Sequence, residues 1–216
     1  MKKTLYLAAI FAFCLQAQSQ NARIGFTAGA SFANFHSKAN GSSDNGNSKI
    51  GLLAGMLVDV PLSSQFSFQP GLQLVQKGTK DEQTSGGSTE KVKLNINYVE
   101  LPLNFLYNAK SNAGNFFIGA GPSVAFGISG KWKYDAPGTS LTQNVKFGNS
   151  DQDDIKSMDV GANFTTGFCF PDGLFIAADY NMGISNLAPG GSANGTLKSH
   201  YFGIRLGCLL KGNNKK

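Results

Sequence analysis

The chain has 216 residues and a formal net charge of +6, with only 15% charged residues, 27 glycines and 17 phenylalanines. The charged fraction is low compared with the quarter or so that is usual in soluble domains. No basic stripe interleaved with aromatic residues is present, which argues against a nucleic-acid-binding protein. No stretch beyond the N-terminal region approaches the roughly eighteen apolar residues of a transmembrane helix.

The N-terminal residues 1–19 are typical of a secretory signal peptide. A basic start precedes an apolar run at residues 5–15, and small residues precede a cleavage site after Ser19. The apolar run is too short to span a bilayer. We therefore expect residues 20–216 to form the mature protein as one domain.

Beyond the signal peptide, apolar residues alternate with small or polar ones, as expected for strands. Residues 115–129 show this pattern best, because Phe116 and Phe126 fall on one face of a strand while Ser123 and Ser129 fall on the other. Eight such segments follow one another along the chain. They span residues 23–35, 50–62, 66–77, 94–107, 115–129, 157–170, 174–187 and 198–210.

The connections between the predicted strands alternate between short turns and long polar segments rich in Asn, Ser and Gly. The short ones are residues 63–65, 108–114 and 171–173, and the long ones are residues 36–49, 78–93, 130–156 and 188–197. This sorting of lengths is typical of an outer-membrane barrel. The sequence therefore predicts an all-β fold: an eight-stranded antiparallel transmembrane β-barrel with short periplasmic turns and long extracellular loops, located in the cell outer membrane. A soluble lipocalin-like barrel is the alternative.

Charge collects on the predicted inward faces of the strands. The outward faces, such as that of Ile24, Phe26 and Phe32, are almost free of charge. The inward charged residues are Arg23, Asp59, Lys77, Glu100, Asp159, Asp179 and Arg205. Because an eight-stranded barrel is only wide enough for side chains to fill, we expect these residues to form a structural, salt-bridged lumen network. An ion path and a small-ligand site are the alternatives for the same residues.

The sequence predicts no catalytic site, no metal site and no cofactor. It contains neither a Gly-x-Ser-x-Gly nucleophile motif nor a cluster of metal-ligating residues. Two histidine–serine pairs, His36–Ser37 and Ser199–His200, are expected near the long-loop rim. The alternation turns both histidines outward, which disfavours a catalytic constellation.

Two further groups are interpreted as structural. Cys169 and Cys208 are expected near strand ends on the same side of the sheet, with another strand between them. That separation is too large for a disulfide. The acidic run of Asp151, Asp153 and Asp154 is interpreted as a solvated loop, with a cation site as the alternative.

Four short motifs occur in order along the predicted strands. They are Tyr98-Val99-Glu100-Leu101-Pro102-Leu103, Gly119-Ala120-Gly121-Pro122-Ser123, Asp159-Val160-Gly161 and Asp179-Tyr180-Asn181-Met182-Gly183-Ile184-Ser185-Asn186. In this order and spacing the chain resembles the PorT-like outer-membrane β-barrel family, similar to eight-stranded barrels of the OmpA and OmpX kind. The resemblance covers essentially the whole mature chain and implies the fold and an outer-membrane location. Because the family's namesake serves protein export, it also implies a secretion-system partner as one option.

The favoured function is that of a non-enzymatic outer-membrane barrel that anchors surface loops for envelope structure or recognition. The expected partners are outer-membrane lipids, the barrel-assembly machinery and either an extracellular ligand or a secretion-system partner. A small pore or channel, a component of a protein secretion system and a lipid-modifying enzyme are the alternatives. A barrel fold is compatible with all of these functions, so the function has to be inferred from the residues of the site.

Overall fold

The computed structural model describes residues 22–39, 42–85, 88–190 and 195–210. The predicted signal peptide at residues 1–19 lies outside these ranges, and its cleavage stays a prediction. No helix in the described ranges is long and apolar enough to cross a bilayer.

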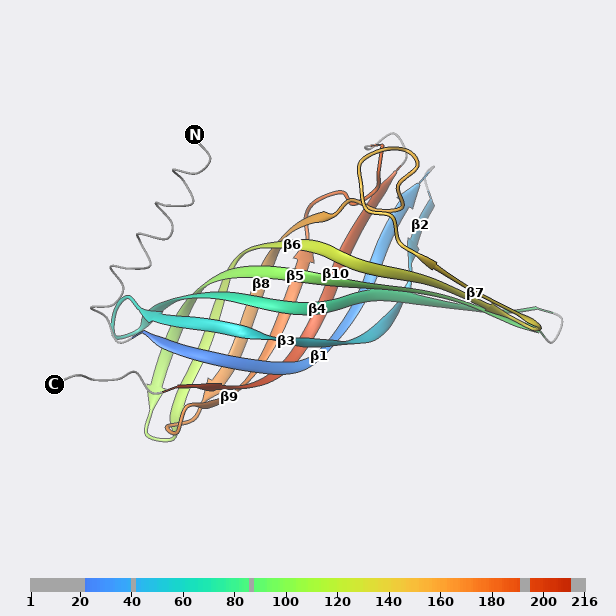
Figure 1. Ribbon diagram of the computed structural model, residues 1–216. Helices are drawn as coiled ribbons and strands as arrows, with labels where there is room; N and C mark the ends of the chain where they lie inside the picture. Colours follow the sequence, from blue (N-terminus) through green and yellow to red (C-terminus); the bar gives the residue numbers. More distant parts are fainter. Residues whose placement is uncertain (1–21, 40–41, 86–87, 191–194, 211–216) are drawn as a thin grey trace.

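Eight strands of the described chain close into a ring (Figure 1). In ring order they are β1 (Arg23–Ala39), β3 (Asn47–Pro61), β4 (Phe66–Ser85), β5 (Ser88–Ser111), β6 (Gly114–Ala136), β8 (Met158–Cys169), β9 (Leu174–Gly183) and β10 (Thr196–Leu209). All neighbours are antiparallel, and β10 pairs with β1 to close the ring. Two short strands, β2 (Ser42–Asn45) and β7 (Thr139–Asn144), extend the sheet from β1 and β6. The predicted all-β, eight-stranded antiparallel barrel is confirmed.

Alternating side chains give the ring an apolar outside and a mixed inside. On β1, Ile24, Phe26 and Phe32 are exposed, whereas Thr27 and Ser31 are buried. The same alternation runs around the barrel and produces a continuous apolar band on its outer surface. Four exposed aromatic residues lie at the short-turn end of this band: Phe66, Tyr107, Phe116 and Phe170. A band of this kind is stable when lipid covers it.

Two apolar clusters fill the interior, one toward each end of the barrel. The cluster at the short-turn end consists of Leu57, Leu106, Phe117, Cys169, Phe175, Ala177 and Leu209. The cluster at the long-loop end includes Phe35, Leu94, Ile96, Val145, Ile155 and Leu187. Polar and charged side chains lie between the two clusters. The lumen is therefore a packed core over much of its length.

The short turns meet at one end of the barrel, as predicted. They lie at residues 62–65, 112–113 and 170–173. In the last of these, Gly173 has a φ of +96°, and a Cβ at this position would collide with the Leu209 carbonyl oxygen. The Leu209 amide donates to the Gly173 carbonyl at 2.8 Å, so this turn also fixes the end of β10. Only glycine meets both requirements without strain.

Three of the long connections expected as loops contain long strand segments, which corrects the sequence analysis. Residues 36–49 carry the end of β1, all of β2 and the start of β3. Residues 78–93 continue the β4–β5 hairpin up to the pair Ser85↔Ser88, and β6 runs on to Ala136 and pairs with β5 and β7. Figure 1 shows β4, β5, β6 and β7 projecting together beyond the rest of the ring. Their polar composition is typical of loops, but cross-strand pairing satisfies the backbone hydrogen bonds. We call this projection the extracellular blade: residues 78–85, 88–97, 129–136 and 139–144.

Two local placements also differ from the alternation expected in the sequence. A register irregularity between Asn97 and Tyr98 turns Ser129 to the outer face, where its hydroxyl accepts from Asn97 Nδ2 at 2.9 Å. Cys169 and Cys208 are both free and are separated by β9, as expected. They face opposite sides of the sheet rather than the same side, because Cys169 belongs to the inner cluster and Cys208 continues the outer row.

Candidate functional site

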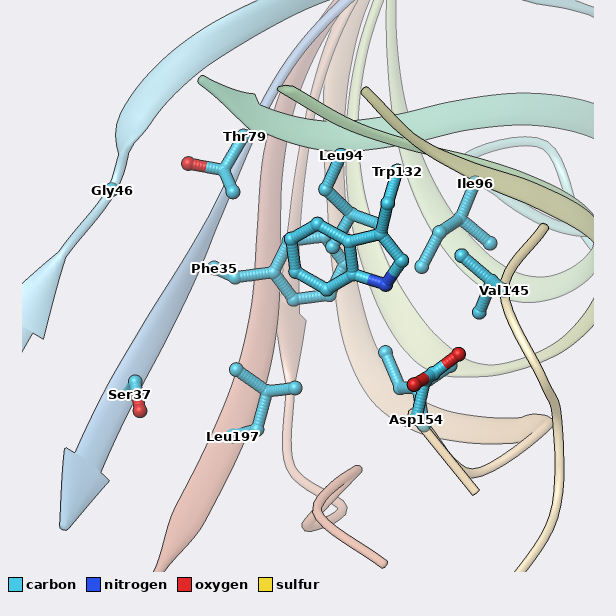
Figure 2. Close-up of a pocket in the computed structure, with 11 residues that line it drawn as sticks. Phe35, Ser37, Gly46, Thr79, Leu94, Ile96, Trp132, Val145, Asp154 and Leu197 are labelled. Carbon is cyan, nitrogen blue, oxygen red and sulfur yellow. The ribbon is translucent and has the colours of Figure 1, made fainter. Parts of the chain in front are cut away.

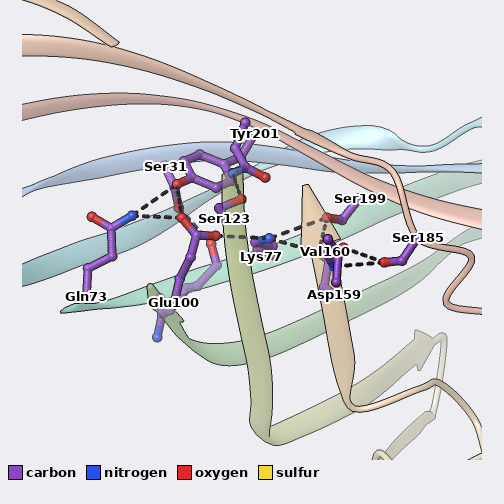
Figure 3. Close-up of polar contacts among 12 residues, drawn as sticks. Ser31, Gln73, Lys77, Glu100, Ser123, Asp159, Val160, Ser185, Ser199 and Tyr201 are labelled. Carbon is purple, nitrogen blue, oxygen red and sulfur yellow. Dashed lines mark hydrogen bonds and ion pairs between the residues drawn. The ribbon is translucent and has the colours of Figure 1, made fainter. Parts of the chain in front are cut away.

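The centre of the lumen holds a buried cation between two carboxylates (Figure 3). Lys77 Nζ lies 2.9 Å from Asp159 Oδ2 and 3.3 Å from Glu100 Oε2. It also donates to Ser199 Oγ at 3.4 Å and lies 5.2 Å from the centre of the Tyr201 ring. The Lys77 and Glu100 side chains are only 1% exposed. We call Lys77, Glu100, Asp159, Ser199 and Tyr201 the Lys77 group.

Neutral donors satisfy the remaining carboxylate oxygens of this group. Glu100 Oε1 accepts from the Tyr201 hydroxyl at 2.6 Å and from Gln73 Nε2 at 2.9 Å. Asp159 Oδ1 accepts from Ser185 Oγ at 3.1 Å, and Asp159 Oδ2 accepts from Ser199 Oγ at 2.5 Å. Hydrogen bonds of this kind are what make a buried ion pair tolerable in a core.

Local sequence explains why the Lys77 group fits inside a narrow barrel. The charged members come from β4, β5 and β8, and β6 lies between the last two strands. The β6 residues paired with these positions are small. Gly127 is paired with Tyr98 on β5, and Ala125 is paired with Glu100 on β5 and with Asp159 on β8. Small residues on this strand leave the volume that the long side chains occupy.

A second ion pair lies deeper in the lumen, toward the short turns. Arg205 on β10 binds Asp179 on β9 with two hydrogen bonds, Nε to Oδ2 at 2.6 Å and Nη2 to Oδ1 at 2.9 Å. Arg205 Nη2 also reaches Thr165 Oγ1 at 3.4 Å. The residue opposite Arg205 on β1 is Gly29, whose missing side chain lets the arginine approach the neighbouring backbone. Such forked pairing fixes both geometry and charge.

A third ion pair closes the short-turn end. Arg23 Nη2 lies 2.7 Å from Asp59 Oδ2, and the two residues are directly opposite each other on β1 and β3. The Arg23 side chain is 38% exposed, so this pair borders the periplasmic mouth. A recess of about 490 Å³ opens there, lined by both residues and by the three short turns.

The structure thus brings the seven charged residues predicted for the lumen into three groups. Lys77, Glu100 and Asp159 meet in one, Asp179 and Arg205 in the second, and Arg23 and Asp59 in the third. Sequence reasoning based on charge missed their neutral partners, which are Gln73, Thr165, Ser185, Ser199 and Tyr201. A signal for two of them was present, because Ser199 and Tyr201 precede Arg205 by even numbers of residues and so share its face.

Above the Lys77 group, the extracellular mouth forms an apolar cup (Figure 2). The cup has a volume of about 130 Å³. Phe35, Leu94, Trp132 and Leu197 contribute apolar side chains to it, and Asp154 is its one acidic lining residue. The blade supplies Leu94 and Trp132, so the cup is continuous with the inner face of the blade.

In each histidine–serine pair the two side chains lie on opposite faces of the barrel wall: Ser37 lines the inner cup, for example, whereas His36 lines a recess of the outer face. Ser199 donates to Asp159 inside the lumen, whereas His200 follows it on the strand, faces outward and is paired with Asn34 on β1. In the acidic loop, Asp153 accepts from the amide and hydroxyl of Ser150, both at 2.8 Å, and these bonds lower the pKa of Asp153. No group of three or more metal-ligating side chains occurs in the part of the chain that the structure describes.

Family comparison agrees with this geometry. The family described as outer membrane protein beta-barrel domain matches residues 16–188. The chain therefore belongs to this family of outer-membrane β-barrels and is located in the outer membrane. No curated protein matches the chain significantly.

Solved structures with a similar fold are distant in sequence. Ail of Yersinia pestis, solved with the heparin analogue sucrose octasulfate, is 12% identical, with 88% of this chain and 99% of Ail covered and a TM-score of 0.42. OprG of Pseudomonas aeruginosa is 10% identical, with coverage of 89% and 97% and a TM-score of 0.41. The outer-membrane protease OmpT of Escherichia coli is 9% identical, with coverage of 88% and 96% and a TM-score of 0.37. The names of these proteins differ in kind, since OmpT is a protease and Ail is an attachment invasion locus protein.

Proposed function

We propose that this protein is a non-conducting, non-enzymatic barrel that holds the extracellular blade rigidly above the outer membrane for recognition or envelope structure. The observation that carries this proposal is the pairing of charge in the lumen. Each of the three lumen cations, Arg23, Lys77 and Arg205, is held by at least one carboxylate within 2.9 Å. Because these cations are held in ion pairs, their side chains obstruct the lumen and do not form a path for ions.

The shape of the long-loop end supports a display function. A paired sheet of four strands keeps its surface residues in fixed relative positions, as a flexible loop does not. The outward orientation of His200, opposite to that of Ser199, supports the non-enzymatic part of the proposal, because a nucleophile and its base must be within hydrogen-bonding reach.

Single-channel conductance of the refolded mature protein in a planar bilayer tests this proposal, after a heat-modifiable gel shift confirms folding. We expect the native barrel to be silent, because the ion pairs and the two apolar clusters fill its lumen, and we expect the triple variant Lys77→Ala, Glu100→Ala, Asp159→Ala to leak more than the native barrel, because it empties the centre of the lumen. Lys110→Ala, outside the lumen, is the matched control and should stay silent. Discrete openings of the native barrel would contradict the proposal and favour a pore.

A role in protein secretion is the second candidate, and it rests on the resemblance to PorT-like barrels. Three of the motifs that carry the resemblance contain charged lumen residues, namely Glu100, Asp159 and Asp179. A secretion partner would have to contact the periplasmic rim around Arg23 or the blade. Crosslinking from each of these two ends in intact cells separates the alternatives, since a barrel without such a partner gives no specific product at either end.

A further inference from the structure

The outer face of the extracellular blade concentrates positive charge above the apolar band. Six lysines and two carboxylates lie on this face: Lys49, Lys80, Lys91, Lys93, Lys131 and Lys133, with Glu82 and Asp135. The inner face of the same strands is different, because Leu94 and Trp132 line the apolar cup there. The two faces of the blade therefore have separate chemistry.

Three of these lysines stand directly opposite one another on adjacent strands. Lys80 on β4 pairs with Lys93 on β5, and Lys93 pairs with Lys133 on β6. Strands are about 4.8 Å apart, so three like charges lie within roughly 10 Å. Like charges directly opposite each other destabilise a sheet. A row of this kind lowers the stability of the unliganded blade, which an anionic ligand would reverse.

The charges on this row are only partly compensated by the protein. Lys133 has an ion pair with Asp135 at 3.0 Å. Among the described residues, no carboxylate lies within ion-pairing distance of Lys80 or Lys93. The Lys49 side chain lies near the same row of lysines. It passes over Gly78, and its Nζ donates to Asn95 Oδ1 at 2.9 Å.

The lysines lie on the same face of β4, β5 and β6 as the apolar band, farther along the strands toward the extracellular end. Leu74, Val99 and Phe126 form one cross-strand row of the apolar band. The next row outward is Gln76, Asn97 and Ser129, which is polar but uncharged. The lysine rows come next. The surface thus changes from apolar to polar to cationic in the order in which a lipid changes from acyl chain to headgroup.

The height of the lysines identifies the kind of headgroup. The row of Lys80, Lys93 and Lys133 lies about 20 Å beyond Leu74 along the strands, which is on the order of 15 Å above Leu74 once strand tilt is included. A phospholipid headgroup layer is only about 5 to 8 Å deep. A headgroup that carries phosphate on a saccharide extends far enough to meet these lysines.

We propose that the outer face of the blade binds the phosphorylated saccharide headgroup of an outer-leaflet glycolipid of the lipopolysaccharide type, which packs beside the barrel. The acyl chains lie against the row of Leu74, and phosphates lie against Lys80, Lys93 and Lys133. This inference goes beyond the proposed display function and does not depend on whether the lumen conducts. It assigns the blade a lipid partner with defined chemistry.

Native mass spectrometry of the folded full barrel in non-ionic detergent measures binding of rough-form lipopolysaccharide. We expect Lys80→Gln, Lys93→Gln, Lys133→Gln to weaken the apparent affinity by about fivefold for each lysine, or on the order of a hundredfold in total. The matched control Lys110→Gln, Lys146→Gln, Lys156→Gln lies away from the outer face of the blade, changes the net charge equally and should bind like the native protein. All variants are first checked for the heat-modifiable gel shift.

Three comparisons separate the proposed ligand from other anions. Chemical dephosphorylation of the lipopolysaccharide should abolish the difference between the native and triple-variant barrels, and phosphatidylglycerol should bind both equally. Equal lipopolysaccharide affinity of the native and triple-variant barrels would overturn the proposal. Phosphatidylglycerol binding that falls as steeply in the triple variant would overturn the assignment to a saccharide headgroup. Binding of a soluble sulfated polysaccharide as tightly as lipopolysaccharide would overturn the assignment to a membrane lipid.

Discussion

At the scale of single residues, Lys77 determines whether the centre of the lumen is stable. Its ammonium group is the one cation within ion-pairing distance of Glu100 and Asp159 among the described residues. Removing it leaves two carboxylates in a space that excludes water, and desolvated charges without a partner are strongly destabilising. The neutral donors around the group cannot replace the missing charge.

We expect Lys77→Met to lower the free energy of unfolding by about 3 to 5 kcal/mol. Urea titration of barrels refolded into lipid vesicles, followed by gel mobility, measures this change. The combined variant Lys77→Met, Glu100→Gln, Asp159→Asn should recover much of the loss, because no uncompensated charge is left. A Lys77→Met barrel with an unchanged urea midpoint would show that the buried pairing is not structurally important.

Substitutions at Gly29 and Gly203 measure how tightly the strands pack around the ion pair of Arg205 and Asp179. A Cβ at Gly29 would lie 2.7 Å from Arg205 Cα and would collide with the Ile204 carbonyl oxygen, whereas a Cβ at Gly203 would meet nothing closer than 3.5 Å. We expect Gly29→Ala to destabilise the barrel by roughly 1 to 3 kcal/mol through overpacking. Gly203→Ala should change stability by no more than about 0.5 kcal/mol. Equal effects in the same urea assay would contradict this account.

The pH response of the blade depends on Asp135. Its carboxylate accepts from the Ser140 hydroxyl at 2.7 Å and pairs with Lys133 at 3.0 Å, and these contacts hold the pKa of Asp135 below its ordinary value. A lowered pKa in the folded state means that the contribution of Asp135 to stability is present at neutral pH and is lost as the pH falls through that lowered pKa.

We expect Ser140→Ala to raise the pKa of Asp135, because the hydroxyl is the main cause of the shift. Carbon-13 NMR of the labelled carboxyl in micelles follows the titration. Thr142→Val is the control, since Thr142 lies on the same face two residues along β7 and gives Asp135 no hydrogen bond among the described contacts. An unchanged titration in Ser140→Ala would refute the assigned cause.

At the scale of the elements, the blade shows how polar residues form strands. Much of its sequence is Lys, Glu, Asp, Asn and Gly, which are residue types depleted in strands. Each strand is nevertheless paired along its length, and ion pairs such as Lys91–Glu82 at 3.4 Å join neighbouring strands. Exposed ion pairs of this kind contribute only a little, so the continuous backbone ladder from the barrel provides most of the order.

Amide hydrogen exchange in micelles tests whether the blade is a sheet in solution. We expect the amides of residues 79–84 and 89–95 to exchange at least about tenfold more slowly than those of the loop at residues 149–154, and faster than those of the barrel wall. The loop is the internal control, because it lies at the same end of the barrel. Equal exchange rates in the blade and this loop would contradict the paired strands.

At the scale of the whole molecule, closure of the ring does not depend on the blade. β10 pairs with β1 over fourteen residue pairs, and the charged groups of the lumen lie below the blade. The outer apolar band and the two inner clusters are likewise formed mainly by the ring itself. The display element and the membrane anchor are therefore separable in structural terms.

We expect replacement of residues 80–93 by Asn-Gly to leave a folded barrel. Thr79 and Leu94 are directly paired, so a two-residue turn can join them. The heat-modifiable gel shift should persist, and the lipopolysaccharide affinity should fall by at least about 25-fold, because two lysines of the row are removed. Replacing the loop at residues 150–153 by Asn-Gly is the control for shortening the same end. Failure of the shortened barrel to fold would show that the blade is part of the stable core.

The sequence was sufficient to predict the ring but not the way its upper end is built. Alternation placed Phe26, Glu100 and Arg205 on their correct faces, because membrane strands must keep charge away from lipid. It failed at Ser129, where a register irregularity changes the face, and it failed for the blade, whose composition resembles that of loops. The neutral partners of the lumen charges were missed because hydroxyls and amides occur on both faces of strands.

By itself the sequence determined the fold class, the strand number, the lipid-facing surface and the set of lumen charges. These follow from a period of two residues and from the exclusion of charge by lipid, both of which act along the chain. Only the tertiary structure decided which charges pair, as Lys77 does with Asp159 and Glu100, and which lysines line up across the blade. The reason is that pairing depends on register between strands, and register is set by contacts between residues that are far apart in the sequence.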